Sequence, residues 1–230
     1  MKILAFIPAR KGSKRITDKN IRLLSGKPLI AWTIEATLAA GLDMDVVVST
    51  DSTEIAAIAE QYGAQVPFLR PEQLAGDTTP TFDVLEYTLN ALKMVGKNYD
   101  AVVLLQPTSP LRKAIHIAEA LQLLEQPEVR SVVSVSELDY PVEWSMPLPE
   151  DRSMDNFIVQ NEQALRTRSQ DFSKRYRLNG AVYCARTADI LQHKSFYMRQ
   201  GTRAYIMDKA FAVDIDDLFD FEYAEFLIKR

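Results

Sequence analysis

The sequence predicts an α/β fold in which helices cover a doubly wound, mostly parallel sheet. Short apolar runs, typical of strands buried on both faces, alternate along the chain with stretches of helical periodicity. A polar stretch over residues 137–174 breaks this alternation, and Pro141, Pro147 and Pro149 interrupt any long helix within it. We interpret this stretch as an excursion from the sheet.

The expected elements follow from the alternation in chain order. Apolar runs predict strands over residues 3–7, 45–49, 64–67, 101–105 and 131–136. Helical spacing of apolar residues predicts helices over residues 28–40, 53–62, 82–94 and 114–124. After the excursion, the same patterns predict strands over residues 181–184 and 204–207 and a last helix over residues 218–228.

Length and composition indicate one globular domain over residues 1–230. A chain of 230 residues can form one large α/β domain with a substantial core, but not two full catalytic domains. Hydrophobic residues at 47% and charged residues at 25% argue against global disorder. The formal net charge of −4 argues against a general binder of nucleic acid or of anionic membranes.

The start of the chain and its single cysteine each support one expectation. The apolar run in the opening MKILAFIPAR is too short, and is followed too soon by charged residues, to be a signal peptide or a membrane span. We therefore expect a cytoplasmic protein. Cys184 cannot form an intrachain disulfide, and its apolar neighbours indicate a buried structural thiol.

A basic loop follows the first predicted strand, where ligands bind in open parallel sheets. Residues 8–15 read PARKGSKR, and Lys19 and Asn20 come next. Gly12 lets backbone N–H groups approach phosphate oxygens, and the Arg and Lys side chains neutralise their charge. The loop matches neither the Walker nor the dinucleotide glycine pattern. It favours polyphosphate binding, with a solvated basic loop as the alternative.

Two further segments follow predicted strands. Residues 104–112, LLQPTSPLR, hold polar side chains between two prolines and could hydrogen-bond a sugar; a capped turn before the next helix is the alternative. Asp214 and Asp216 have strand-alternate spacing, so both carboxylates can face one way and hold Mg²⁺ with phosphate oxygens. The alternative there is an acidic helix N-terminus, to which Asp217 would belong.

The sequence lacks the residue patterns that other catalytic schemes require. His116 and His193 do not have metal-ligand spacing, and the chain contains no GxSxG elbow. Zinc-enzyme and hydrolase interpretations are therefore disfavoured.

The three segments together, in this order, resemble the acylneuraminate cytidylyltransferases, or CMP-sialic acid synthetases. The signature of that family opens with IPAR-x-GSK and a following KN, and here residues 7–14 read IPARKGSK before Lys19 and Asn20. The likeness covers nearly the whole chain and extends through GKPL at 26–29, STD at 49–51, RPE at 70–72, LA at 74–75, LQPTSP at 105–110, NGA at 179–181 and DIDD at 214–217.

The resemblance implies roles for individual residues in a Rossmann-like nucleotidyltransferase that transfers CMP from CTP to a nine-carbon acidic sugar. The catalytic residues would be Arg10, Lys14, Lys19 and Asp214. The nucleotide would be bound by Ala9, Arg10, Gly12, Ser13, Lys14, Asn20, Arg70 and Thr81. The sugar would be bound by Gln106, Arg168, Arg177 and Asn179. Asp214 and Asp216 would hold Mg²⁺.

The resemblance also implies a homodimer. In the family the excursion is a dimerisation element that reaches into the partner's active site, which makes residues 137–174 the expected element here and Arg168 the candidate acting in trans. Some relatives carry a lysine after the proline of this excursion, whereas Val142 follows Pro141 here. N-acetylneuraminic and legionaminic acid are the expected sugars, with the Kdo and pseudaminic acid enzymes as the alternatives.

Two functions from other classes remain possible on the sequence. Asp214-Ile215-Asp216 is formally the D-x-D of a nucleotide-sugar glycosyltransferase, although such enzymes need no loop this basic. A non-catalytic nucleotide-binding module would bind CTP without releasing pyrophosphate, although retention of both aspartates and the basic loop disfavours it.

Overall fold

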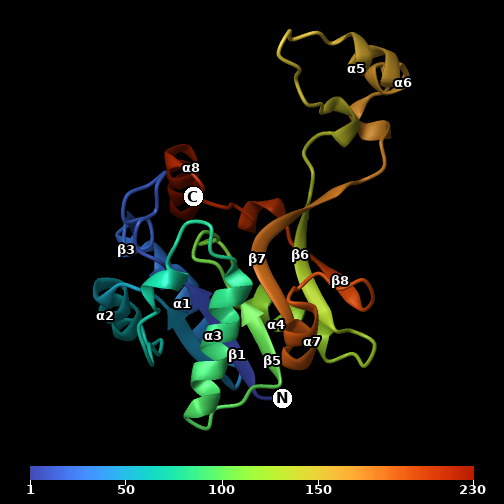
Figure 1. The fold of residues 1–230 in the computed structure, drawn as a ribbon. Helices are drawn as coiled ribbons and strands as arrows, with labels where there is room; N and C mark the ends of the chain where they lie inside the picture. Colours follow the sequence, from blue (N-terminus) through green and yellow to red (C-terminus); the bar gives the residue numbers. More distant parts are fainter.

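The computed structural model describes residues 1–230, and its body is built on one six-stranded sheet (Figure 1). The strands lie in the order β4-β1-β5-β7-β6-β8. Their bounds in chain order are β1 (Ile3–Pro8), β4 (Met44–Ser49), β5 (Ala101–Leu104), β6 (Ser131–Glu137), β7 (Tyr176–Arg186) and β8 (Thr202–Ile206). Two further short strands, β2 (Leu23–Leu24) and β3 (Lys27–Pro28), pair with each other outside this sheet.

The sheet is mostly parallel, as the sequence predicts. β1 pairs in parallel with both β4 and β5, and β6 pairs in parallel with β8. β7 is antiparallel to its neighbours β5 and β6. An apolar run looks the same whichever way the strand runs in the sheet. The run at residues 181–184 could therefore not predict that β7 is antiparallel.

Helices cover both faces of the sheet. Alternate residues of β1 point to opposite sides, so Ile3, Ala5 and Ile7 join one core cluster while Leu4 and Phe6 join another. The first cluster packs against α1 (Leu29–Leu38), α2 (Thr53–Gln61) and α4 (Ala114–Leu124); the second packs against α3 (Thr81–Met94) and α7 (Thr187–His193). The doubly wound arrangement is therefore confirmed.

Two elements differ from the sequence prediction. The strand expected over residues 64–67 does not form, because only Gln65 bridges to Val47. Helix α7 was not predicted, and it contributes only one buried residue, Ile190, so its apolar periodicity is weak. None of the helices in the structure is long and apolar enough to cross a membrane.

A third core cluster joins the first loop to the end of the chain. Ile16 packs there with Val213, Ile215 and Phe221, the last of which belongs to α8 (Leu218–Lys229). This packing brings the basic loop and the acidic segment together although they are about two hundred residues apart in sequence.

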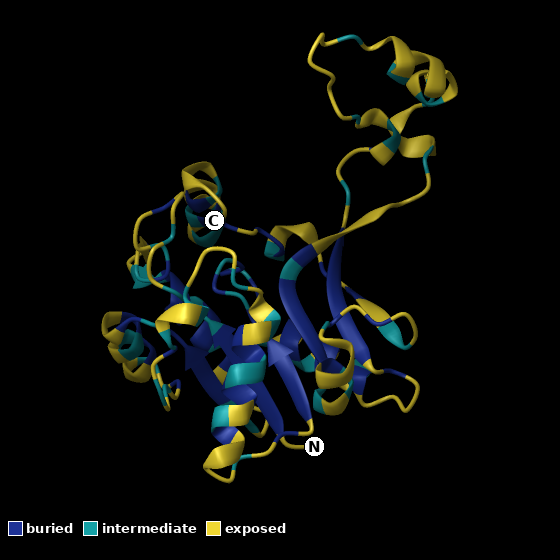
Figure 2. Ribbon diagram, in the orientation of Figure 1, coloured by how far each residue is buried: buried dark blue, intermediate teal, exposed yellow.

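The excursion is an arm that projects from the body between β6 and β7 (Figure 1). It contains α5 (Asp155–Gln160), α6 (Glu162–Arg166) and short 3-10 turns, and most of its residues are exposed (Figure 2). Trp144 supports the arm internally: its ring lies 5.8 Å edge-on from that of Phe172, and its Nε1 donates a hydrogen bond to the Ala164 carbonyl at 3.2 Å.

Candidate active site

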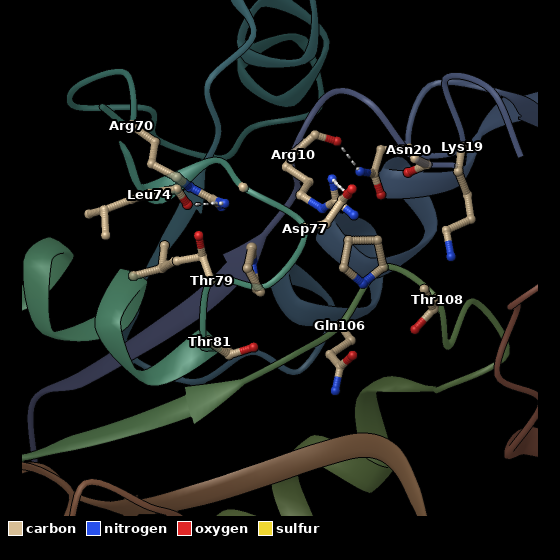
Figure 3. A pocket seen from close by; sticks show the side chains of 15 residues that line it. Arg10, Lys19, Asn20, Arg70, Leu74, Asp77, Thr79, Thr81, Gln106 and Thr108 are labelled. Atoms are coloured by element: carbon tan, nitrogen blue, oxygen red, sulfur yellow. Dashed lines mark hydrogen bonds and ion pairs between the residues drawn. The ribbon is translucent and has the colours of Figure 1, made fainter. Parts of the chain in front are cut away.

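A polar pocket of about 270 Å³ lies beside the carboxyl ends of β1, β4 and β5 (Figure 3). The first loop, the segment before α3 and the turn after β5 form its walls. Its lining residues are Pro8, Arg10, Ser13, Lys19, Asn20, Arg70, Leu74, Gly76, Asp77, Thr79, Thr81, Val84, Gln106, Pro107 and Thr108. The pocket therefore collects residues from the first two candidate segments of the sequence.

Hydrogen bonds at both ends hold the first loop in place. The amide of Ala9 donates to the Ser49 carbonyl at 2.9 Å, and the amide of Lys11 donates to Asp51 Oδ1 at 2.8 Å. At the far end, Asn20 Nδ2 donates to the Arg10 carbonyl at 2.9 Å. The loop that carries the basic side chains is thus closed on itself and fixed to the end of β4.

The cations of the loop meet an acidic residue that the sequence analysis did not single out. Arg10 Nη1 lies 2.5 Å from Asp77 Oδ1 (Figure 3). Lys14 Nζ lies 2.5 Å from Asp77 Oδ2. The same Arg10 nitrogen donates to the Gly12 carbonyl at 3.2 Å. Hydrogen bonding from Lys14, and then from Arg10, holds the pKa of Asp77 below its ordinary value.

Arg70 is buried and is bonded mainly to the protein itself. Its Nη2 donates to the Ser49 carbonyl at 2.6 Å, and its Nε donates to Ser49 Oγ at 3.3 Å. Its Nη1 reaches the Leu74 carbonyl at 3.5 Å, so Arg70 fastens the segment before α3 to the end of β4.

Lys19 connects the first loop to the acidic segment. Its Nζ donates to the Ile215 carbonyl at 2.8 Å. Burial lowers the pKa of Lys19 below its ordinary value, against the attraction of Asp216 and Asp214. A backbone bond from the Ile215 amide to the Thr108 carbonyl, at 2.8 Å, ties the same segment to the turn after β5.

The side chains of Asp214 and Gln106 both lie close to Gly180. A Cβ built on Gly180 would stand 3.6 Å from Gln106 Nε2 and 3.7 Å from Asp214 Oδ2. Although the Asp214 side chain reaches solvent, nearby protein atoms desolvate its carboxylate and raise its pKa, which a hydrogen bond from Thr108 opposes. The carboxylate is therefore costly to ionise in the free protein and suited to receive a cation.

The other two aspartates of the segment have partners at the surface. Asp216 Oδ2 forms an ion pair with Arg15 Nη1 at 2.9 Å. Asp217 is the N-cap of α8, and its Oδ1 accepts the Asp220 amide at 3.1 Å. No group of three or more His, Cys, Asp or Glu side chains gathers to form a metal cage.

Asn179 belongs to a buried polar network in a β-bulge. The pairing of β6 with β7 shifts register between Val133 and Val135, and Asn179 lies in the bulged part of β7. Its Nδ2 donates to Ser136 Oγ at 2.8 Å, and its Oδ1 accepts the Ala181 amide at 3.1 Å. The amide of Asn179 thus supports the turn at Gly180, whose φ of +74° favours glycine.

Arg112 is a buried cation that holds three parts of the site together. Its Nη1 donates to the carbonyls of Ala181 at 2.7 Å and Gln106 at 3.2 Å, and its Nη2 donates to Thr33 Oγ1 at 2.7 Å. Burial lowers the pKa of Arg112 to about 9, so it stays charged at neutral pH. Arg112 therefore positions the backbone under the Gln106 side chain.

Comparison with known proteins identifies the family. The family model described as "Cytidylyltransferase" matches residues 4–227. The chain is 39% identical to CMP-N,N'-diacetyllegionaminic acid synthase from Legionella pneumophila, with 100% of this chain and 97% of that protein covered. The chain belongs to the cytidylyltransferase family.

One further relative and one solved structure extend the comparison. The chain is 40% identical to N-acylneuraminate cytidylyltransferase from Escherichia coli O18:K1:H7 over 97% of this chain, but it spans only 51% of that longer protein. The structure of CMP:2-keto-3-deoxy-manno-octonic acid synthetase complexed with CTP superposes with a TM-score of 0.72 at 17% identity, covering 100% of this chain and 99% of that one. That likeness supports the Rossmann-like fold.

The predicted site residues divide into three groups in this cytidylyltransferase. Those that line the pocket are Arg10, Ser13, Lys19, Asn20, Arg70, Thr81 and Gln106. Those that do not line it but lie next to lining residues along the chain or in space are Ala9, Gly12 and Lys14 in the first loop, and Asp214 and Asp216 on either side of Ile215, whose carbonyl accepts the Lys19 hydrogen bond. Those outside its lining are Asn179, which is buried, Arg177, which is exposed on β7, and Arg168, which lies on the arm.

Sequence reasoning missed Asp77 and the close approach of Gly180. Asp77 sits in a polar loop and belongs to no spacing pattern, so its contact with Arg10 depends on the path of residues 75–80. Gly180 stands in a strand-like segment, where an isolated glycine indicates a bulge or a close backbone approach. That signal was present in the sequence.

Proposed function

We propose that the protein transfers CMP from CTP to the anomeric hydroxyl of a nine-carbon acidic sugar, N-acetylneuraminic or legionaminic acid, and releases pyrophosphate. The observation that carries the proposal is the joining of the basic loop to the acidic segment by Lys19 at the mouth of one polar pocket. The two relatives with about 40% identity, one named for each sugar, support the choice of substrate.

The basic loop is the proposed triphosphate site. Arg10, Ser13 and Lys19 line the pocket, and Lys14 lies next to them at the Asp77 carboxylate. The loop ends are fixed by backbone hydrogen bonds, so the cations are held near one another before a ligand arrives. Such pre-positioned charge is the main source of catalysis in phosphoryl transfer.

Asp214 and Asp216 are the proposed ligands of a divalent cation, with Mg²⁺ as the expected ion. Magnesium is commonly held by one or two carboxylates together with substrate phosphates, so the absence of a three-residue cage fits this use. The desolvated carboxylate of Asp214 also fits, since a cation would relieve the cost of its charge. When bound, Mg²⁺ would neutralise phosphate charge and favour loss of the hydroxyl proton.

The reaction forms a bond from the sugar's anomeric oxygen to the α-phosphorus and breaks the bond from that phosphorus to the leaving pyrophosphate. The hydroxyl proton passes to solvent or to pyrophosphate. Gln106 and the backbone at Gly180 lie next to Asp214, where the sugar must meet the α-phosphate. Arg10, Lys14 and Lys19 would stabilise the negative charge that develops on the leaving oxygens.

The arm is the proposed dimerisation element, with Arg168 acting in the partner's site. The arm exposes several large apolar side chains, which are typical of surfaces that bind another protein. They include Tyr140, Val142, Leu148, Met154, Ile158, Val159 and Leu165. Arg168 lies on this arm and outside the pocket lining of its own chain.

Mixed dimers test action in trans. Arg168→Ala and Asp214→Ala chains should each be inactive alone. Mixed and allowed to exchange, they should recover about a quarter of wild-type activity, because one site of each mixed dimer is intact. No recovery, although mixed dimers form, would place Arg168 in the site of its own chain, and an Arg168→Ala chain that is active alone would place Arg168 outside the mechanism.

A substrate panel tests the reaction itself. Pyrophosphate release should be measured with CTP, Mg²⁺ and one acid at a time: N-acetylneuraminic, di-N-acetyllegionaminic, pseudaminic acid or Kdo, with UTP in place of CTP as the control. Turnover with either of the first two acids and CTP is the expected result. Turnover only with pseudaminic acid or Kdo would move the protein to another branch, and CTP binding without turnover would favour a non-catalytic module.

A further inference from the structure

Asp77 forms ion pairs with Arg10 and Lys14, two cations of the first loop that belong to the proposed triphosphate site. Its two carboxylate oxygens each lie 2.5 Å from a cation, Oδ1 from Arg10 and Oδ2 from Lys14. Asp77 lies on the other wall of the pocket, between the 3-10 turn η1 (Glu72–Leu74) and helix α3. One carboxylate thus bridges two loops across the pocket mouth.

This contact uses donors that a phosphate would need. Arg10 Nη1 carries two hydrogens and already contacts both the Gly12 carbonyl and Asp77 Oδ1. A phosphate oxygen that bonds to this nitrogen therefore competes with these two acceptors. The contact with Gly12 lies within the first loop, whereas the contact with Asp77 joins two separate segments. The Asp77 contact can therefore break without a change in the conformation of the first loop.

The exposure of the three side chains makes displacement feasible. Their exposed fractions are 31% for Arg10, 33% for Asp77 and 78% for Lys14. Ion pairs this open to solvent are individually weak. A triphosphate offers more charge and more acceptor oxygens than one carboxylate, so it can take over both cations.

We propose that Asp77 is an internal competitor of the triphosphate: its carboxylate holds Arg10 and Lys14 in the free protein and must leave when CTP binds. The proposal rests on the proposed function, because it takes these cations to be the triphosphate site. Asp77 thereby weakens the binding of any ligand whose phosphates reach these cations. The binding of pyrophosphate is weakened together with that of CTP. The carboxylate also keeps the two cations close together while the site is empty.

Calorimetric titration of Asp77→Asn and Asp77→Ala tests the competition, with CTP, inorganic tripolyphosphate and cytidine as separate ligands. Both variants should bind CTP and tripolyphosphate about threefold to tenfold more tightly than wild type. Cytidine binding should be unchanged, because cytidine carries no phosphate. This gain in affinity should shrink as the salt concentration is raised from about 0.05 M to about 0.5 M, because the Debye length falls from about 14 Å to about 4 Å.

Two controls separate local competition from a change in overall charge. Asp43→Asn removes one exposed carboxylate far from the pocket, before the amino end of β4, and should leave CTP affinity unchanged. In an Arg10→Ala/Lys14→Ala background, Asp77→Asn should give no further gain, because its partners are gone. A gain of full size in that background would overturn the proposal.

The outcomes also separate this proposal from the proposed function. If wild type binds CTP and both Asp77 variants bind it equally or more weakly, the competition is refuted while the CTP site stands. Weaker binding would mean that Asp77 itself contacts the substrate or its cation. If wild type binds neither CTP nor tripolyphosphate, the proposed function fails as well.

Discussion

Lys19 Nζ donates a hydrogen bond to the backbone carbonyl of Ile215 at 2.8 Å, between the two aspartates proposed to hold the metal. One cation therefore fixes the distance between the basic loop and the acidic segment. Burial lowers the pKa of Lys19, which means that its charged form is poorly solvated. The electrostatic interactions of a poorly solvated charge are strong. Lys19 thus has both a structural and an electrostatic part in the proposed site.

Replacing Lys19 by Met should lower kcat/KM for CTP by about 100-fold, because the variant loses both the charge and the bond to Ile215. The measurement is steady-state pyrophosphate release at saturating sugar. Lys11→Ala is the matched control, since Lys11 is an exposed cation of the same loop that does not line the pocket. A Lys19 variant within a factor of two of wild type would remove this residue from the mechanism.

Replacing Gly180 by Ala should impair the reaction more than the fold. The new Cβ would stand between Gln106 and Asp214, at ordinary contact distance from both, and should raise the KM for the sugar by about tenfold or more. Gly96→Ala is the matched control because Gly96 also has a positive φ, of +79°, and its Cβ would meet nothing within 4 Å. Both variants should lose about 1 kcal/mol in urea unfolding. Equal activity of the two would show that the space beside Gly180 is not used.

The fold was predictable where one local pattern determines one element. The run 101–105 is apolar throughout and the run 131–136 combines valines with small serines, and both formed strands of nearly the expected length. The direction of β7 was not predictable, since Val182 and Cys184 would be buried equally well in either direction. The length of β7 was missed because its first residues, at the base of the arm, are polar and exposed.

The site was predictable where charge follows a strand, and less so where contacts come from loops. Arg10, Lys19 and Gln106 follow β1 or β5 and do line the pocket. Asn179 was expected to border the sugar, but its amide is engaged by Ser136 and the Ala181 backbone, so its contribution there is support for the turn. Its contact with the sugar stays a prediction.

Replacing Asp214 by Asn should stabilise the metal-free protein while removing turnover. The folded pKa of Asp214 is raised above its ordinary value of 3.8, so folding disfavours the charged form. The stability that the protonated group contributes is present below pH 3.8 and is lost as pH rises through the folded pKa. The neutral amide keeps that contribution at pH 7.

Thermal unfolding in EDTA measures this effect. At pH 7 the Asn variant should melt a few degrees higher at most, since 1 kcal/mol corresponds to about 2–4 °C for a chain of this size. The difference should shrink as pH falls toward 4. A variant that melts lower than wild type at pH 7 would mean that the carboxylate is stabilised by its neighbours rather than strained.

Charges placed on the arm should break the dimer without unfolding the body. Ile158→Glu/Val159→Glu changes two consecutive apolar residues of α5 that are 48% and 78% exposed. We expect light scattering to show twice the 26.0 kDa chain mass for wild type and the single chain mass for this variant. Met94→Glu/Val95→Glu, at positions 87% and 70% exposed on the body, should stay dimeric. A wild-type monomer under assay conditions would refute the dimer.

The most direct measurement is the product balance with CTP, Mg²⁺ and di-N-acetyllegionaminic or N-acetylneuraminic acid. Pyrophosphate and the CMP-sugar should be quantified in the same sample, by enzymatic assay and by ³¹P NMR. The two products should appear in equal amounts, and neither should appear without the sugar or when UTP replaces CTP. Pyrophosphate release without a CMP-sugar, or no reaction with either acid, would contradict the proposed function.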